Sequence, residues 1–245
     1  MTHDVGGAPV AVDLTTPDLR TLAALQEAFL ASVDEVDPQA RVAACGRWRV
    51  RDLVVHLARI HHWAAGQARR RPETPLGRGP FDLHALYATQ AAELRATLET
   101  LDPDAPAWTL DDSGVVRFWH RRQVHETLVH LWDLRTAGGL PLDVPAALWA
   151  DTVDEVVHVM HPRQVRLGRS VASPVRVGLV ATDAARTWTV HAADDAPTAP
   201  VAEVTGPAAS LALLLWGRTT ADDPHLAVAG DRTAVRATLG GSLTP

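Results

Sequence analysis

A carboxylate and an imidazole four residues apart offer the clearest chemistry in this chain. They are Glu126 and His130, in a stretch with the character of a helix. Because an α-helix turns about 100° per residue, this spacing places both side chains on nearly the same face. His56 lies among apolar residues in a second helical stretch. If the two helices face each other, two imidazoles and one carboxylate would form a three-ligand metal site with an open position, as in catalytic zinc enzymes.

The spacing of the histidines argues against a zinc protease. His125 and His130 are five residues apart, about 140° around a regular helix, so they cannot both bind one ion. Glu126 is therefore expected to be a metal ligand rather than a general base. Asp133 lies three residues beyond His130 on the same face and is expected to orient it through a hydrogen bond.

The same residues also have purely structural interpretations. A Glu/His pair at this spacing is common on solvated helix faces, and a lone histidine such as His56 is more often a core residue. The apolar residues around Glu126 and His130 favour the metal site. His61 lies five residues beyond His56, on a different face, and is interpreted as lining a cavity mouth or as exposed. His61 and His125 are candidates for moving protons.

Composition excludes several classes of function. The chain has no lysine, so all 23 basic residues are arginine, which excludes a Schiff-base lysine and a P-loop. A formal charge of −6 gives no electrostatic basis for binding nucleic acid or anionic membranes. The arginines at 69–71 and 121–122 are interpreted as solvated helix ends. The single cysteine, Cys45, excludes an internal disulfide and a multi-thiolate zinc site.

The chain is expected to be cytoplasmic. Its N-terminus lacks the pattern of a signal peptide, and no apolar run approaches the roughly 18 residues that a membrane-spanning helix needs. The absence of lysine and asparagine, with Ile60 as the only isoleucine, indicates a gene of high GC content.

Apolar periodicity predicts a helical first part and a mixed second part. Four helices are expected at residues 18–34, 50–68, 82–101 and 115–137. Connected by short or moderate loops, they suggest a four-helix bundle, a fold that builds metal sites from facing helices. The first helix is expected to begin with Thr16 as its N-cap and Pro17 in its first turn.

The second part is expected to be a small α+β domain. Its predicted elements are a helix at 146–158, a hairpin of strands 175–180 and 187–191, a strand at 202–205, a helix at 208–216, a strand at 226–229 and a helix at 232–239 capped by Asp231. The predicted organisation is a flexible leader (1–14), a metal-binding bundle (15–145) and this domain (146–245).

Three stretches resemble one known family. They are Cys-x-x-Trp-x-Val-Arg-Asp-Leu-x-x-His-Leu from Cys45, Arg-x-x-His-Glu-x-x-x-His-x-x-Asp from Arg122, and Gly-Pro-Ala-Ala-x-Leu to Leu-Trp-Gly-Arg over 206–218. They resemble the mycothiol-dependent maleylpyruvate isomerase family, a branch of the DinB-like metal proteins. The resemblance implies a DinB-like four-helix bundle followed by a sterol-carrier-like α+β domain. It also implies His56, Glu126 and His130 as zinc ligands.

The resemblance further implies a reaction type. Mycothiol, the low-molecular-weight thiol of actinobacteria, would be the cosubstrate of a zinc-dependent isomerase or S-transferase acting on a small electrophile. Zinc bound by two neutral imidazoles and one carboxylate keeps a net charge of about +1 and can hold a thiolate. Arginine side chains could bind an acidic substrate in bidentate fashion. Two alternatives stay open: a thiol-independent hydrolase or lyase that uses metal-bound water, and a non-catalytic ligand-binding protein.

Overall fold

The structure, a computed structural model, divides into two compact units, residues 1–144 and 145–245. It describes residues 10–11, 16–190, 193, 196, 198–241 and 243–244. The predicted flexible leader therefore lies outside the described residues except for Val10–Ala11. These two residues form strand β1, which pairs in parallel with β2 (Leu142–Asp143).

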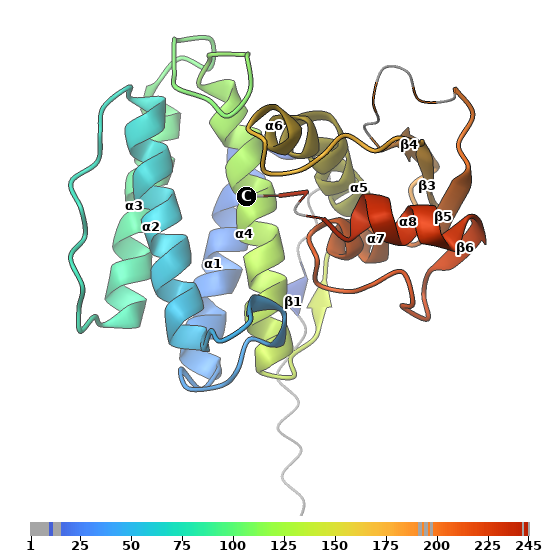
Figure 1. Cartoon of the computed structure of the whole chain (residues 1–245). Coiled ribbons are helices and arrows are strands. Elements are labelled where there is room, and N and C mark those ends of the chain that lie inside the picture. The colour runs from blue at the N-terminus through green and yellow to red at the C-terminus, as the bar shows by residue number, and fades with distance from the viewer. Residues whose placement is uncertain are drawn as a thin grey trace, which may run out of the picture. The chain divides into compact units, whose positions relative to one another are not determined.

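The first unit is a bundle of four long helices that lie side by side (Figure 1). They are α1 (Leu19–Glu35), α2 (Val50–Ala68), α3 (Leu83–Thr100) and α4 (Arg117–Ala137). Helix α2 packs against α3 and α4, and α1 packs against the same two helices. The predicted four-helix region is confirmed, and each helix begins and ends within two residues of its expected position.

Side-chain hydrogen bonds set the starts of two of these helices, α1 and α3. Asp18, not the expected Thr16, is the N-cap of α1, because its carboxylate accepts a hydrogen bond from the Thr21 backbone N–H. Asp82 caps α3 in the same way. A carboxylate at this position satisfies a backbone donor that has no partner within the helix. The Thr16–Pro17 prediction was wrong because a better acceptor follows two residues later.

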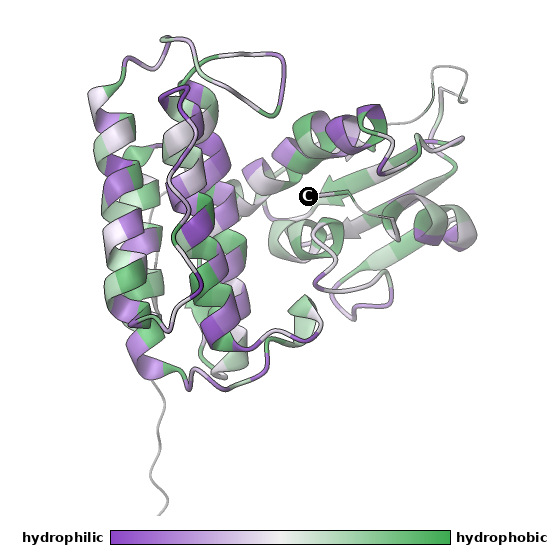
Figure 2. Cartoon of the chain, turned by 60° about the vertical axis from the view of Figure 1, so that its left-hand side comes forward, coloured by the Kyte–Doolittle hydropathy of each residue, from purple (hydrophilic) through white to green (hydrophobic). Residues whose placement is uncertain are grey.

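Each bundle helix presents an apolar stripe to the centre. Figure 2 shows hydrophobic and hydrophilic residues sharing the same helices, as expected for helices with one solvated face. Fully buried residues recur at helical spacing; they include Leu22, Leu25 and Phe29 in α1, Leu53 and Leu57 in α2, Leu94 in α3, and Leu128 and Leu131 in α4. Burial of each such side chain contributes about 1.5–3 kcal/mol. This core holds α2 against α4.

The second unit is built on a four-stranded mixed sheet in the order β4-β3-β5-β6. The strands are β3 (Val177–Ala181), β4 (Arg186–Thr189), β5 (Ala202–Gly206) and β6 (Ala227–Gly230). β3 runs antiparallel to β4 and parallel to β5, and β6 runs antiparallel to β5. The predicted hairpin and both further strands are therefore present, although His191 lies outside the described residues.

Helices α7 (Ala208–Leu215) and α8 (Arg232–Leu239) pack on this sheet, and α5 (Ala146–Glu155) packs on α7. Asp231 caps α8 as expected, accepting from the backbone N–H groups of Thr233 and Ala234. The fold class, a helical region followed by a small mixed-sheet domain, is thus confirmed.

One helix is longer than predicted. It was expected to end at His158, but a π-helical turn, η2 (Val156–Met160), continues it into α6 (His161–Arg166). Pro162 lies in the first turn of α6. A proline ring clashes with a regular helical carbonyl four residues earlier, and the wider π turn relieves this contact. Within the described residues, no helix is both long and apolar enough to cross a bilayer.

Candidate metal centre

Three side chains from two helices converge inside the bundle. His56 of α2 places Nε2 3.6 Å from Glu126 Oε1 of α4, and His130 Nε2 lies 3.3 Å from the same oxygen. One donor atom from each residue lies within 4.8 Å of the other two. The imidazole rings of His56 and His130 meet edge to face, with centroids 5.0 Å apart. The structure therefore brings together the three residues singled out as metal ligands.

The donor set and two of its three donor–donor separations fit a zinc ion. In a tetrahedral site with bonds of about 2.0–2.1 Å, neighbouring donor atoms lie about 3.3–3.4 Å apart. The separations of 3.3 Å and 3.6 Å from Glu126 Oε1 are close to this value. Two imidazoles with one carboxylate are a donor set that catalytic zinc uses with a fourth position open. Zinc ligation by these residues stays a prediction that this geometry supports.

The centre opens on one side. Glu126 and His130 are only 6% and 4% exposed, whereas the His56 side chain is 31% exposed. The Trp48 ring packs against the His56 imidazole, with centroids 4.8 Å apart. A small molecule would therefore approach the cluster from the side of His56 and Trp48.

Asp133 forms a hydrogen bond with the His130 ring on the side away from Glu126. Its Oδ2 lies 2.9 Å from His130 Nδ1, so Nδ1 donates and Nε2 is left to face Glu126, as expected from the spacing. Burial alone would lower the pKa of His130, but the hydrogen bonds to Asp133 and Glu126 outweigh it and raise the pKa to about 9. Cys45, in the short 3₁₀ turn η1 (Ala43–Cys45), places Sγ 3.7 Å from Asp133 Oδ2. This contact of the thiol with the site was not anticipated.

Comparison with known proteins identifies the family. A family model described as "Mycothiol maleylpyruvate isomerase N-terminal domain" matches residues 19–135, and one described as "MDMPI C-terminal domain" matches residues 147–237. The chain belongs to the mycothiol maleylpyruvate isomerase family. This confirms the family expected from the sequence motifs and supports the expectation that the chain is an enzyme.

Solved structures agree with the family in fold. A crystal structure of a histidine-to-alanine mutant of the mycothiol-dependent maleylpyruvate isomerase matches with a TM-score of 0.62 and 13% identity. A second crystal structure of the mycothiol-dependent maleylpyruvate isomerase matches with a TM-score of 0.58, also at 13% identity. Both matches cover 87% of this chain and 92% of the other. At this identity the likeness shows the shared fold. No curated protein sequence matches the chain.

Arg122 is the main residue of the centre that its sequence position did not reveal. The pair 121–122 was interpreted as a solvated helix end, but Arg122 is buried and its guanidinium contacts Glu126 Oε2 one helical turn away. Burial would raise the pKa of Glu126, but the Arg122 charge and the hydrogen bonds from His130 and His56 hold it well below its usual value. Arg122 therefore keeps the carboxylate ionised. The arginines at 69–71 are exposed, as expected.

The two histidines suggested for proton transfer are both fully buried. His61 points away from solvent, so its interpretation as exposed or at a cavity mouth was wrong. Its Nδ1 lies 2.9 Å from Gln123 Oε1, and its Nε2 lies 3.4 Å from the Tyr87 hydroxyl. His125 lies on another face of α4 from Glu126 and His130. Proton transfer by His61 or His125 stays a prediction.

Substitution Asp133→Asn is expected to weaken zinc binding by about 10–100-fold, the usual effect of losing a hydrogen-bond partner of a metal-ligating histidine. The asparagine keeps the size of the side chain but removes its charge and leaves the tautomer of His130 undetermined. Competition against a coloured zinc chelator would measure the affinity. An unchanged affinity would show that Asp133 does not support the centre.

The burial of His61 predicts a loss of stability in weak acid. Burial lowers its pKa from 6.5 to about 4, and the hydrogen bond to Gln123 offsets only part of this. Between these values the unfolded chain binds a proton that the folded chain does not, so stability falls as the pH falls. A shift of this size corresponds to about 3 kcal/mol.

Urea unfolding of zinc-free protein at several pH values would test this prediction. In His61→Asn the amide can replace Nδ1 in the hydrogen bond to Gln123 but does not titrate. The difference in unfolding free energy between the two proteins should therefore change between pH 6.5 and 4. If the unfolding free energies of the two proteins changed with pH in parallel, the prediction for His61 would be wrong. The pKa of His130 is raised from 6.5 to about 9, so its protonation changes the unfolding free energy above pH 6.5, outside this pH range.

Proposed function

We propose that this protein is a zinc-dependent enzyme that activates mycothiol for isomerisation of, or S-transfer to, a small electrophilic substrate. The observation that carries the proposal is the convergence of His56, Glu126 and His130. One donor atom from each lies within 4.8 Å of the other two, at a buried centre that opens on the side of His56. Family membership supports the thiol dependence and the isomerase chemistry. The cytoplasmic location and an actinobacterial source stay predictions.

The residues of the centre have distinct tasks in this proposal. His56, Glu126 and His130 would hold the ion, Asp133 orients His130, and Arg122 keeps Glu126 ionised. Zinc bound there would supply the positive charge that favours the thiolate of mycothiol over the thiol. Lowering a thiol pKa from about 8.5 by two units requires roughly 2.7 kcal/mol of preference for the anion. The His56 side chain is partly exposed, so the thiol could enter from its side.

The thiolate is the nucleophile in both candidate reactions. In an isomerisation, sulfur adds to one carbon of an activated double bond, and the π electron pair moves to the activating group. Rotation about the resulting single bond and expulsion of the thiolate give the other isomer and regenerate the cosubstrate. In an S-transfer, sulfur instead displaces a leaving group, which departs with its electron pair, and the thioether is the product.

The pKa of the mycothiol thiol in the presence of the protein tests this proposal. With equimolar zinc-loaded protein, the ultraviolet absorbance of the thiolate should appear about two pH units below its usual range. The Glu126→Ala protein should not produce this shift. An unshifted thiol in the presence of zinc-loaded protein would contradict thiol activation. Activity without any thiol would then favour a hydrolase or lyase, and protein without zinc would favour a binding role.

A further inference from the structure

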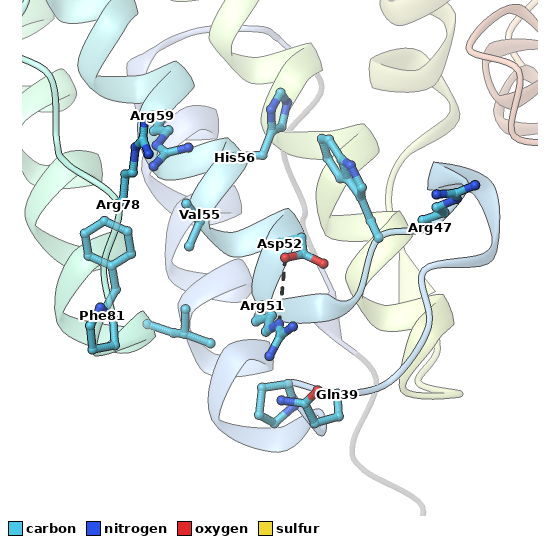
Figure 3. A pocket seen from close by; sticks show the side chains of 13 residues that line it. Gln39, Arg47, Arg51, Asp52, Val55, His56, Arg59, Arg78 and Phe81 are labelled. Carbon is cyan, nitrogen blue, oxygen red and sulfur yellow. Dashed lines mark ion pairs between the residues drawn. The ribbon is translucent and has the colours of Figure 1, made fainter.

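A cavity of about 970 Å³ in the first unit adjoins the candidate centre. His56 belongs to its wall, so a molecule in the cavity reaches the open side of the centre (Figure 3). Trp48, Val55 and Phe81 supply apolar parts of the wall. A cavity of this size has room for a small organic molecule next to His56.

The wall of this cavity is positively charged, although the chain as a whole carries a formal charge of −6. Four arginines line it, Arg47, Arg51, Arg59 and Arg78, against a single carboxylate, Asp52. Asp52 already accepts a hydrogen bond from the Arg49 backbone N–H and lies 3.7 Å from Arg51 Nε. The carboxylate therefore does not neutralise the remaining arginines, and the cavity favours anions.

One face of α2 places an arginine next to the candidate metal ligand. Asp52, Val55, His56 and Arg59 all line the cavity and are spaced as successive positions of one helical stripe. Arg59 is three residues beyond His56, a rise of roughly 4.5 Å along the helix axis. A molecule of a few carbon atoms can therefore contact Arg59 while its reacting carbon lies at the centre.

A hydrogen bond brings a second arginine to the same end of the cavity. Arg59 Nη2 donates to the carbonyl oxygen of Gly77, at 2.8 Å, in the loop between α2 and α3. Arg78 follows directly, and Figure 3 shows both guanidinium groups at one end, away from Arg47. Arg78 has no carboxylate partner among the residues that the structure describes. Since a guanidinium has five N–H donors, most donors of this pair remain available to a ligand.

From this arrangement we infer that Arg59 and Arg78 are specificity-determining residues that bind a carboxylate of the substrate. The planar guanidinium matches a carboxylate in bidentate geometry, and the apolar wall suits the carbon skeleton of an organic acid. That the bound molecule is the substrate rests on the proposed function. The anion site itself depends only on the cavity and its arginines.

Succinate is a suitable probe because its diamide, succinamide, has the same carbon skeleton without charge. Calorimetric titration of the zinc-loaded protein should show succinate binding and at least about tenfold weaker binding of succinamide. Arg78→Gln and Arg59→Gln should each weaken succinate binding by at least about tenfold. Arg71→Gln is the matched control: Arg71 is an exposed arginine at the start of the same loop but does not line the cavity. It should bind succinate normally.

Because carboxylates also bind zinc, the titrations are repeated with zinc-free protein, and the zinc content of every variant is measured. Weaker binding in the Arg78→Gln protein at unchanged zinc content supports the anion site. Equal binding of succinate by wild type and Arg78→Gln, or equal binding of succinate and succinamide, would overturn it. Tighter binding of inorganic phosphate than of succinate would overturn the choice of a carboxylate. If the protein bound succinate but contained no zinc, the proposed zinc-dependent function would be wrong while the anion site would stand.

Discussion

Replacing His130 by alanine is expected to lower the zinc content of the purified protein from about one ion per chain to background. His130 would supply one of the three donors that converge among the described residues, and its Nε2 lies 3.3 Å from Glu126 Oε1. Loss of an indirect partner of a metal ligand already costs about 10–100-fold in affinity, so loss of a ligand should cost more. Thiol-dependent activity should disappear together with the metal. Elemental analysis by mass spectrometry gives the zinc content directly.

A matched histidine provides the control for this experiment. His84 lies on the exposed surface of the same unit, where its Nδ1 contacts Asp34 Oδ1 at 2.9 Å, and it is not part of the cluster. His84→Ala should therefore retain zinc and activity. His56→Ala and Glu126→Ala should lose zinc as His130→Ala does. A full zinc complement in any of these three variants would remove that residue from the ligand set.

Replacing Arg122 by methionine is expected to destabilise the zinc-free protein by about 3–5 kcal/mol. The substitution removes one partner of a buried ion pair and leaves the Glu126 carboxylate without its main positive neighbour. Removing one partner of a buried ion pair typically costs this much, although the protonated His130, 3.3 Å from Glu126 Oε1, still faces the carboxylate. Methionine keeps most of the volume of the arginine stem, so the loss of packing is small. Urea unfolding at neutral pH measures the change in free energy.

The double variant Arg122→Met/Glu126→Gln separates charge from packing. Removing both charges should recover most of the lost stability, since the neutral amide no longer needs a cation. A loss of stability in the double variant as large as that in Arg122→Met would show that packing, not the buried charge, causes the effect. Added zinc should stabilise Arg122→Met more than wild type, because the ion replaces part of the missing positive charge.

Local patterns in the sequence predicted most of the elements. Apolar residues at helical spacing placed the four bundle helices within two residues of their observed ends. The main errors in the elements concern where helices begin and end. Asp18 replaced Thr16 as a cap, and a π turn carried a helix past His158 to Arg166. The cap depends on a side-chain hydrogen bond and the π turn on the ring of Pro162, and apolar periodicity describes neither.

Helix geometry predicted which side chains share a face of one helix. The spacing of Glu126, His130 and Asp133 sets their angles around α4, so their shared face and the hydrogen bond from His130 to Asp133 followed from helix geometry alone. The composition excluded lysine chemistry and a multi-thiolate zinc site. The motifs pointed to the family, which the match over both parts of the chain then confirmed.

Which face of each helix meets which neighbour depends on how the helices pack together. His56 and His61 point in different directions on α2, and packing alone decided that His61 enters the core while His56 meets Glu126. The same packing buried Arg122 beside Glu126 and brought the loop arginine Arg78 to the cavity. Spacing along the chain fixes angles within one helix. Contacts between helices depend on how all the apolar stripes are buried together, which no single stretch of sequence specifies.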